Sequence, residues 1–369
     1  MEPFEIFLMA PPGLEPLLAD EARRAGFADP RAVPGGVTTT GGWADVWRAN
    51  LCLRGAGRVT AQIGAFRAFH LAQLDKRARR FDWGAVLRPD VPLRVEVATN
   101  RRSKIYHAGA AKQRIETALA EELGAPLAAD AELCVRARID DNLVVLSVDT
   151  SGEPLHRRGF KEAVGKAPMR ETMAAMFLRA CGYDGSEPVL DPMCGSGTFV
   201  IEAAEIAAGL APGRARGFAF ERLATFDADT WTAMRDRPAR PLPPLRFHGS
   251  DRDAGVFAMA RANAQRAGIA EICAFEKRSV GDLHPPEGPP GLVIVNPPYG
   301  GRIGDKKPLY GLHGALGEVL RTRFAGWRVG IVTSEGSLAR ATGLPFVEEG
   351  PPVAHGGLRV RLYRTGILP

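Results

Sequence analysis

A glycine-rich segment at residues 191–198 has the residue types of a ligand-binding turn. It reads Asp-Pro-Met-Cys-Gly-Ser-Gly-Thr and lies between a short apolar run and a helical pattern from Ser196 to Gly209. Two glycines two positions apart let the backbone turn sharply and approach a ligand without Cβ interference. The start of the helix offers free N–H groups and a positive dipole end, which favour a carboxylate or a ribose. No Gly-Lys-Ser/Thr follows, so a nucleoside-triphosphate loop is excluded.

Acidic residues follow the next predicted strand, Leu245–Ser250. A carboxylate at this position can accept hydrogen bonds from ribose hydroxyls. Asp253 directly precedes a helical pattern that begins at Ala254, which is the position of a helix cap. We therefore predict Asp251 as the ribose ligand, and the alternative is that either aspartate only caps the helix.

The tetrapeptide Asn296-Pro-Pro-Tyr299 follows a fully apolar strand predicted at Leu292–Val295. The carboxyl end of such a strand is where doubly wound sheets bind ligands. The Asn296 side-chain oxygen and the Pro297 carbonyl can accept hydrogen bonds from an exocyclic amino group, which favours a pyramidal, nucleophilic nitrogen. The prolines fix this geometry in advance, and Tyr299 offers a face for base stacking. The predicted catalytic residues are therefore Asn296, Pro297, Pro298 and Tyr299; the alternative is a proline-rich turn that only ends the strand.

A doubly wound, mostly parallel sheet is predicted from residue 168 onward. Helical and apolar patterns alternate there, and Phe346–Glu349 and Leu358–Arg364 could form a final antiparallel pair. Residues 212–244 are rich in proline and arginine and lack periodicity, which predicts an insertion on the surface.

The first 150 residues predict a mixed α+β region instead. Helices are expected at Leu71–Leu87 and Ile105–Leu123, and Leu133–Ile139 and Leu143–Val148 flank a tight hairpin turn. Residues 153–167 combine glycines with a basic cluster, which predicts a connection between domains. The expected domains are residues 1–65, 66–152 and 153–369, the last beginning with that basic connection.

Composition indicates a water-soluble protein in a reducing compartment. The net charge is +6 with a pI near 9.2, which gives weak support for a polyanionic partner. The five cysteines form no Cys-x-x-Cys pair and the histidines show no metal spacing, so we expect no metal site. No signal peptide and no apolar stretch of about 18 residues is present, so we expect a cytoplasmic protein without a membrane partner.

Together these motifs resemble class I RNA methyltransferases that carry a THUMP domain, an RNA-binding module. The resemblance rests on residues 191–199, 249–253 and 296–300, on the lead-in segments 155–160 and 167–172, and on residues 100–109 for the THUMP part. It is closest to the N-terminal, guanine-N2-modifying half of the bacterial RlmL type and covers nearly the whole chain. It implies an α/β fold in which a Rossmann-like, seven-stranded methyltransferase domain follows an α+β ferredoxin-like and THUMP region.

The same resemblance implies sites for S-adenosylmethionine and for RNA. The cofactor set would be Arg170, Glu171, Asp191, Pro192, Met193, Cys194, Gly195, Ser196, Gly197, Thr198, Asp251, Arg252 and Asn296, together with Ser279 or Asp282 at the adenine. Family members usually have an acid at the position of Ser279, so the choice between those two residues stays open. The RNA contacts would be Arg101, Arg102 and Lys104, with Arg157, Arg158 and Lys161 in the basic connection.

The function expected from the resemblance is methylation of guanosine N2 in structured RNA, with 23S ribosomal RNA as the first candidate and transfer RNA as the second. A DNA adenine-N6 methyltransferase uses the same tetrapeptide, but the N-terminal region resembles an RNA-gripping module. A non-catalytic RNA-binding assembly factor would not need the intact motifs at residues 191–198 and 296–299. The oligomeric state is left open.

Overall fold

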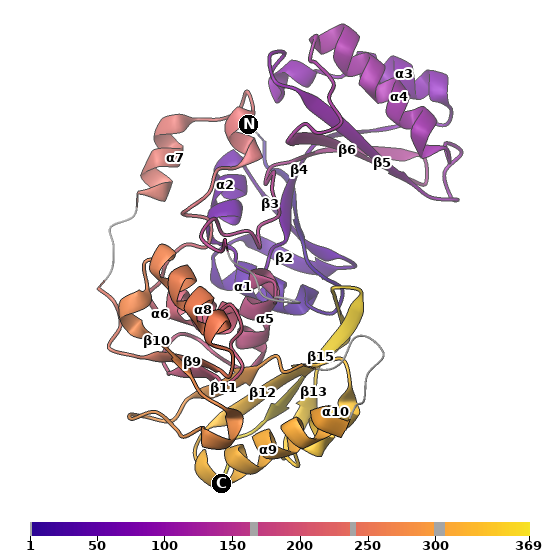
Figure 1. Cartoon of the computed structure of the whole chain (residues 1–369). Coiled ribbons are helices and arrows are strands. Elements are labelled where there is room, and N and C mark those ends of the chain that lie inside the picture. Colours follow the sequence, from indigo (N-terminus) through magenta and orange to yellow (C-terminus); the bar gives the residue numbers. More distant parts are fainter. Residues whose placement is uncertain (1, 163–168, 237–240, 299–306) are drawn as a thin grey trace. The chain divides into compact units, whose positions relative to one another are not determined.

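The structure is a computed structural model that describes residues 2–162, 169–236, 241–298 and 307–369 (Figure 1). The chain divides into two compact units, each made of separate segments. The N-terminal unit comprises Met1–Ala10, Ala19–Leu155 and Arg216–Arg237, and the catalytic unit comprises Pro11–Leu18, His156–Ala215 and Pro238–Pro369. The α+β and α/β classes predicted for the two regions are confirmed.

The N-terminal unit is built on one seven-stranded sheet with the order β2-β3-β1-β4-β7-β6-β5. Its strands are β1 (Phe4–Met9), β2 (Ala28–Val33), β3 (Gly36–Gly41), β4 (Arg58–Arg67), β5 (Leu93–Thr99), β6 (Leu133–Asp140) and β7 (Leu143–Asp149). Its helices are α1 (Glu15–Arg24), α2 (Trp43–Cys52), α3 (Leu71–Arg79), α4 (Ala108–Ala118) and, from a later segment, α7 (Ala228–Arg235), with α1 shared between the units. Strand β4 runs across the border predicted at residue 65, so the ferredoxin-like and THUMP regions share one sheet.

The turn between β6 and β7 is the tight hairpin that the sequence predicts. Asp141 and Asn142 both have positive φ angles, 47° and 60°, as a two-residue turn of this kind requires. Two helices differ from the prediction. Helix α3 ends at Arg79, and the Trp83 indole N–H then donates to the Ala78 carbonyl at 2.8 Å. Helix α4 begins only at Ala108 and continues as a π-turn, Leu119–Leu123.

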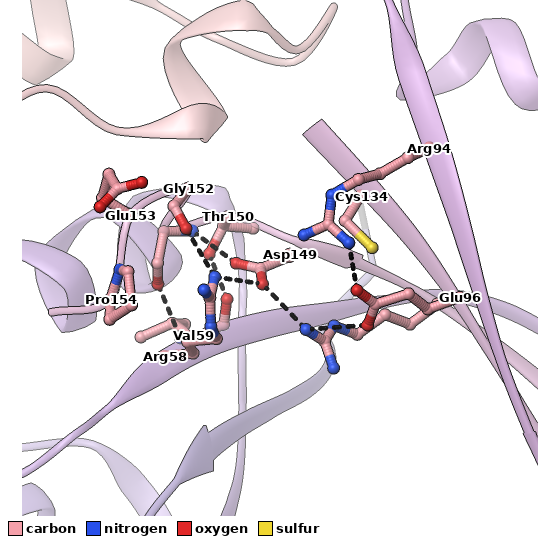
Figure 2. A network of polar contacts seen from close by, with 12 residues as sticks. Arg58, Val59, Arg94, Glu96, Cys134, Asp149, Thr150, Gly152, Glu153 and Pro154 are labelled. Atoms are coloured by element: carbon pink, nitrogen blue, oxygen red, sulfur yellow. Dashed lines mark hydrogen bonds and ion pairs between the residues drawn. The ribbon is translucent and has the colours of Figure 1, made fainter. Parts of the chain in front are cut away.

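A polar network links strands β4, β5, β6 and β7, which form the THUMP half of the N-terminal sheet (Figure 2). The buried Asp149 carboxylate on β7 accepts from Arg58 on β4 at 2.8 Å and from Arg136 on β6 at 3.3 Å. Arg136 also pairs with Glu96 on β5 at 3.2 Å, and Glu96 pairs with Arg94. Asp149 is thus compensated by two guanidinium groups, which a buried carboxylate needs. The network therefore stabilises the sheet at Asp149, the last residue of β7, after which the chain leaves the sheet.

Residues 216–237 correct the prediction of a surface insertion. They belong to the N-terminal unit, where they form a short 3-10 turn (Ala219–Arg222) and helix α7 (Ala228–Arg235). The Phe220 and Phe226 rings lie 6.0 and 5.8 Å from the Trp47 ring of α2, and Trp231 is buried against Phe220. Buried aromatic contacts therefore hold this part of the chain in place. The segment is too short for these aromatic residues to show a helical period in the sequence.

The catalytic unit contains a mixed sheet with the order β10-β9-β8-β11-β12-β15-β13, and the short β14 pairs with β15. Its strands are β8 (Val189–Asp191), β9 (Phe247–Asp251), β10 (Cys273–Lys277), β11 (Leu292–Val295), β12 (Arg328–Thr333), β13 (Phe346–Glu349), β14 (Val353–His355) and β15 (Leu358–Thr365). Its helices are α5 (Glu171–Ala180), α6 (Thr198–Ala207), α8 (Ala254–Arg266), α9 (Lys307–Arg323) and α10 (Gly336–Ala341). The predicted antiparallel pair of β13 and β15 is confirmed.

One face of this sheet packs on α9. Leu316 and Leu320 of the helix and Phe324 directly after it join Val293 and Val295 of β11 in a fully buried cluster. Burial on both faces explains why β11 is an unbroken apolar run and could be predicted to the residue. In the part of the chain that the structure describes, no helix combines the length and apolar character needed to cross a membrane.

Candidate functional site

The glycine-rich turn connects β8 to α6 and is anchored to the neighbouring strand. The Cys194 N–H donates to the Ser250 carbonyl of β9 at 2.9 Å. Gly195 and Gly197 have φ angles of 53° and 84°, a region that glycine enters without strain. A Cβ on Gly197 would lie 3.0 Å from the Ala260 Cβ, whereas a Cβ on Gly195 would meet no atom within 4 Å. Gly197 thus permits close helix packing, and Gly195 leaves open space beside the turn.

Asp251 lies at the end of β9 and faces the glycine-rich turn. Its carboxylate accepts from the Gly195 N–H at 3.2 Å and from the Asp253 N–H at 3.0 Å. Asp253 instead caps α8, accepting from the Gly255 N–H at 2.8 Å. Asp253 is therefore the helix cap and Asp251 is the aspartate that contacts the turn. Asp251 is thus the one placed to bind a ligand there. Arg252 between them is exposed.

Asp191 at the end of β8 is a buried carboxyl group. Burial raises its pKa to about 8, Asp251 adds to the rise, and the Met193 N–H, which donates to it at 3.0 Å, opposes it. Ionising this carboxyl is therefore costly without a cation or further donors beside it. A positively charged ligand at the turn would favour its ionised form.

Asn296 directly follows β11. Its Oδ1 atom is buried and has no hydrogen-bond partner among the described residues. A buried acceptor without a donor costs roughly 1–3 kcal/mol, which a bound N–H group would recover. Pro297 is buried and Pro298 is exposed, and Tyr299 lies outside the described residues.

Strand pairing brings these predicted residues to one edge of the sheet. Strand β8 is parallel to both of its neighbours, with Leu190 opposite Val293 of β11 and Asp191 opposite Gly249 of β9. Asp191, Asp251 and Asn296 therefore follow the carboxyl ends of three adjacent strands. The glycine-rich turn and Asn296, the first residue of the tetrapeptide, belong to the same edge, as the sequence predicts for a shared site.

The two adenine candidates lie beyond β10 at the same edge. The Arg278 N–H donates to the Asp251 carbonyl at 3.0 Å, and the Ser279 hydroxyl donates to the Asp282 carboxylate at 2.7 Å. Both side chains are exposed and joined to each other, so the geometry leaves the choice between them open.

The start of α5 contributes a buried ion pair that the sequence does not suggest. Lys161, predicted as an RNA contact, is 3.0 Å from the Glu171 carboxylate and 2.9 Å from the Thr198 hydroxyl. The side chains of Lys161 and Glu171 are only 9% and 6% exposed. No local sequence pattern links residues ten positions apart, so the sequence gives no signal for this pairing. Arg170, at the cap of α5, is exposed.

Arg158 is also inside the protein. Its guanidinium pairs with Glu202 of α6 at 3.1 Å, and both side chains are at most 1% exposed. Burial removes Arg158 and Lys161 from the set of residues that could contact RNA. The other predicted RNA residues, Arg101, Arg102, Lys104 and Arg157, are exposed.

These residues fit S-adenosylmethionine. Gly195 provides open space, and Asp191, Asp251 and Glu171 provide carboxyl groups. The Asn296 acceptor has no donor in the part of the chain that the structure describes. Together they suit a ligand with an amino acid end, a ribose and a reactive methyl group. No group of His, Cys, Asp and Glu that could hold a metal occurs among the described residues.

Comparison with known proteins identifies the family. Residues 158–350 match the RMKL-like methyltransferase domain, and residues 5–60 match the RlmL ferredoxin-like domain. The candidate RNA methyltransferase slr0064 of Synechocystis sp. is 31% identical over 368 residues, covering 95% of this chain and 94% of that protein.

Two further relatives extend this match. The ribosomal RNA large subunit methyltransferase K/L of Aliivibrio salmonicida is 35% identical over 340 residues, covering 88% of this chain but 48% of that protein. The chain thus spans about half the length of this relative. The crystal structure of SMU.472, a candidate methyltransferase bound to S-adenosylhomocysteine, matches with a TM-score of 0.88, 27% identity and coverage of 100% and 99% of the two chains. The chain therefore belongs to the RMKL-like methyltransferase family and uses S-adenosylmethionine as its cofactor.

Proposed function

We propose that this protein methylates the exocyclic N2 of a guanosine in structured RNA, with 23S ribosomal RNA as the target. The observation that carries the proposal is the buried Asn296 Oδ1 at the end of β11, for which the described residues supply no hydrogen-bond donor, next to the strand that leads into the glycine-rich turn. The ribosomal target is supported by the 35% identity to an enzyme named for ribosomal RNA.

The proposed chemistry is direct displacement at the methyl group. S-adenosylmethionine, when bound, supplies an electrophilic methyl and a thioether leaving group. Asn296 Oδ1 and the Pro297 carbonyl would accept the two N–H bonds of the guanine amine, which directs its lone pair toward the methyl. The two prolines hold these acceptors in place before the base arrives, so orientation is the main contribution of the chain. Water can take the proton after transfer, so no general base is required.

Delivery of the base requires an unpaired or flipped nucleotide. An exocyclic amine inside a stacked helix cannot reach a sheet edge, so the target is expected in a loop or at a helix end. The cofactor-binding set proposed for this step keeps Glu171, Asp191, Gly195, Thr198 and Asp251, with Asp251 at the ribose.

The substrate is tested by incubating the purified protein with methyl-labelled S-adenosylmethionine and 23S ribosomal RNA, transfer RNA or duplex DNA. We expect N2-methylguanosine in the ribosomal RNA alone when the products are digested and analysed by mass spectrometry. N2-methylguanosine in transfer RNA would overturn the ribosomal assignment, and N6-methyladenine in DNA would overturn the RNA assignment. Binding of ribosomal RNA without methylation of any substrate would favour an assembly factor.

An exposed basic and aromatic surface of the N-terminal unit is proposed to hold the RNA. We call it the THUMP tip, and its residues are Arg67, Phe69, Arg101, Arg102, Lys104 and Tyr106. Tyr106 is 64% exposed and Phe69 41%, and the Lys104 ammonium lies 5.7 Å from the Phe69 ring centroid. The Lys104 N–H donates to the Asn142 side chain at 2.9 Å, which ties this loop to the β6–β7 turn. Exposed rings beside cations suit unpaired bases and phosphates.

Substitutions in the THUMP tip should weaken RNA binding without affecting the cofactor site. We expect Tyr106→Ala to lower RNA affinity by roughly 5- to 100-fold, since stacking is worth about 1–3 kcal/mol per base. Arg101→Glu should also reduce the slope of affinity against salt concentration, because it removes a phosphate contact. Fluorescence anisotropy with labelled RNA measures both effects. Arg23→Glu on α1 is the charge-matched control, and an equal loss in that variant would argue against the THUMP tip.

A further inference from the structure

Lys161 makes a set of buried contacts that joins three parts of the catalytic unit. Its ammonium lies 3.0 Å from the Glu171 carboxylate at the first turn of α5, 3.2 Å from the Met169 carbonyl and 2.9 Å from the Thr198 hydroxyl. Thr198 is the first residue of α6 and directly follows Gly197 of the glycine-rich turn. A single lysine side chain from the basic connection thus contacts both Glu171 and Thr198, which are both predicted to line the cofactor site.

The surroundings of this lysine are rich in buried charge. Burial, reinforced by Arg170, Arg157, Arg158 and Lys161, lowers the pKa of His156 to about 4, and burial, Arg170 and Lys161 lower the pKa of His355 on β14. The acids in this region are Glu171 and Glu202, and Glu202 pairs with Arg158. Both histidines are therefore neutral near pH 7, and among the described residues Lys161 is the cation that pairs with Glu171.

Glu171 depends on that cation for its charge. Burial raises the pKa of the Glu171 carboxyl, and Glu202 adds to the rise, while the charge and hydrogen bond of Lys161 oppose it. A buried carboxylate that loses its cation takes up a proton to higher pH. A protonated Glu171 would be a much weaker partner for a cationic ligand group.

We propose that Lys161 is a positioning residue for S-adenosylmethionine: it keeps Glu171 ionised and fixed beside Thr198, where Glu171 receives the ammonium group of the methionine end. The inference rests on the proposed placement of the cofactor at the glycine-rich turn. It gives the basic connection a role inside the catalytic unit in place of the RNA contact that its sequence suggests.

The proposal is tested by binding, without turnover. S-adenosylhomocysteine carries the same ammonium group, so its affinity is measured by calorimetry at pH 6.5, 7.5 and 8.5. The proteins compared are the wild type, Lys161→Met, Lys161→Arg, Glu171→Gln and the double variant Lys161→Met/Glu171→Gln. Arg328→Met is the matched control, because Arg328 pairs with Glu187 at the amino ends of the strands, away from the glycine-rich turn. Thermal unfolding of each protein without ligand separates loss of stability from loss of binding.

We expect Lys161→Met to weaken binding roughly 10- to 100-fold at pH 7.5, the range of a lost charge-assisted hydrogen bond. The ratio of its dissociation constant to that of the wild type should fall as pH rises, because Glu171 then ionises without its lysine. The change is at most tenfold per pH unit for one proton. Lys161→Arg should restore most of the affinity. Glu171→Gln and the double variant should bind weakly with a ratio that does not depend on pH.

Several results would overturn the proposal. One is a Lys161→Met protein that unfolds at lower temperature than the wild type yet keeps wild-type affinity at all three pH values. Tight binding by Glu171→Gln would overturn it even if Lys161→Met does not fold. A wild-type protein that fails to bind S-adenosylhomocysteine would instead contradict the placement of the cofactor itself.

Discussion

Replacing Asn296 by alanine is expected to lower the single-turnover rate of methyl transfer by about 100- to 1,000-fold. The loss follows from removing a preorganised polar group that acts on the reacting amine, and such groups carry effects of this size. Affinity for S-adenosylhomocysteine and for RNA should stay within about twofold of the wild type, since the residue is proposed to act on the amine and other residues hold both ligands.

The comparison variant for this experiment is Pro298→Ala. It removes one of the two prolines proposed to hold the acceptors, at an exposed position, but leaves the Asn296 acceptor itself in place. It should retain more activity than Asn296→Ala. Activity of the Asn296→Ala protein near the wild-type level would contradict the proposed role of the buried acceptor. Loss of cofactor binding in that variant would show that Asn296 supports the glycine-rich turn instead.

Arg158→Met is expected to lower the free energy of unfolding by about 3–5 kcal/mol. The substitution leaves the Glu202 carboxylate without its guanidinium in a site where neither side chain is more than 1% exposed, and breaking a buried pair costs about this much. The double variant Arg158→Met/Glu202→Leu should recover most of the loss, because it also removes the stranded charge. Urea denaturation monitored by circular dichroism measures both values.

Arg157→Met is the control for Arg158→Met, since the neighbouring side chain is exposed. It should change the stability by less than about 0.5 kcal/mol. If Arg158→Met kept full stability but bound RNA weakly, the surface role predicted from the sequence would be right after all.

Complete burial and residues that end an element explain which elements could be predicted from the sequence. Strands β8 and β11 are buried along their whole length and are followed within two residues by proline, so the sequence marks their ends closely. The functional residues follow those strands directly, so the sequence also predicts that they share an edge. The hairpin turn at Asp141 and Asn142 could be predicted from the local sequence alone, because these residue types favour the positive φ angles that the turn requires.

Edge strands and long-range packing explain what could not be predicted. Strand β10 lies at the edge of its sheet and none of its five residues is buried, so an apolar pattern does not mark it in the sequence. Helix α7 is held through Trp231, which packs on Phe220, and Phe220 in turn packs on Trp47, more than 170 residues earlier in the chain.

The basic connection shows a further limit. Arg157 and Arg158 are adjacent and identical in type, yet one is exposed and the other is buried against Glu202. Only the partner, 44 residues later, distinguishes them. A run of basic residues therefore predicts charge but does not say which charges face solvent.

The segmented N-terminal unit constrains the order in which the protein can mature during synthesis. The sheet strands of this unit are complete once Asp149 has been translated, but the aromatic cover of Trp47 comes from residues 220–231. The ribosome must therefore synthesise part of the catalytic unit, including the glycine-rich turn, before the N-terminal unit can bury its own hydrophobic surface. The nascent chain would carry that exposed surface for the whole interval, which makes this stage the natural point for chaperone binding or misassembly.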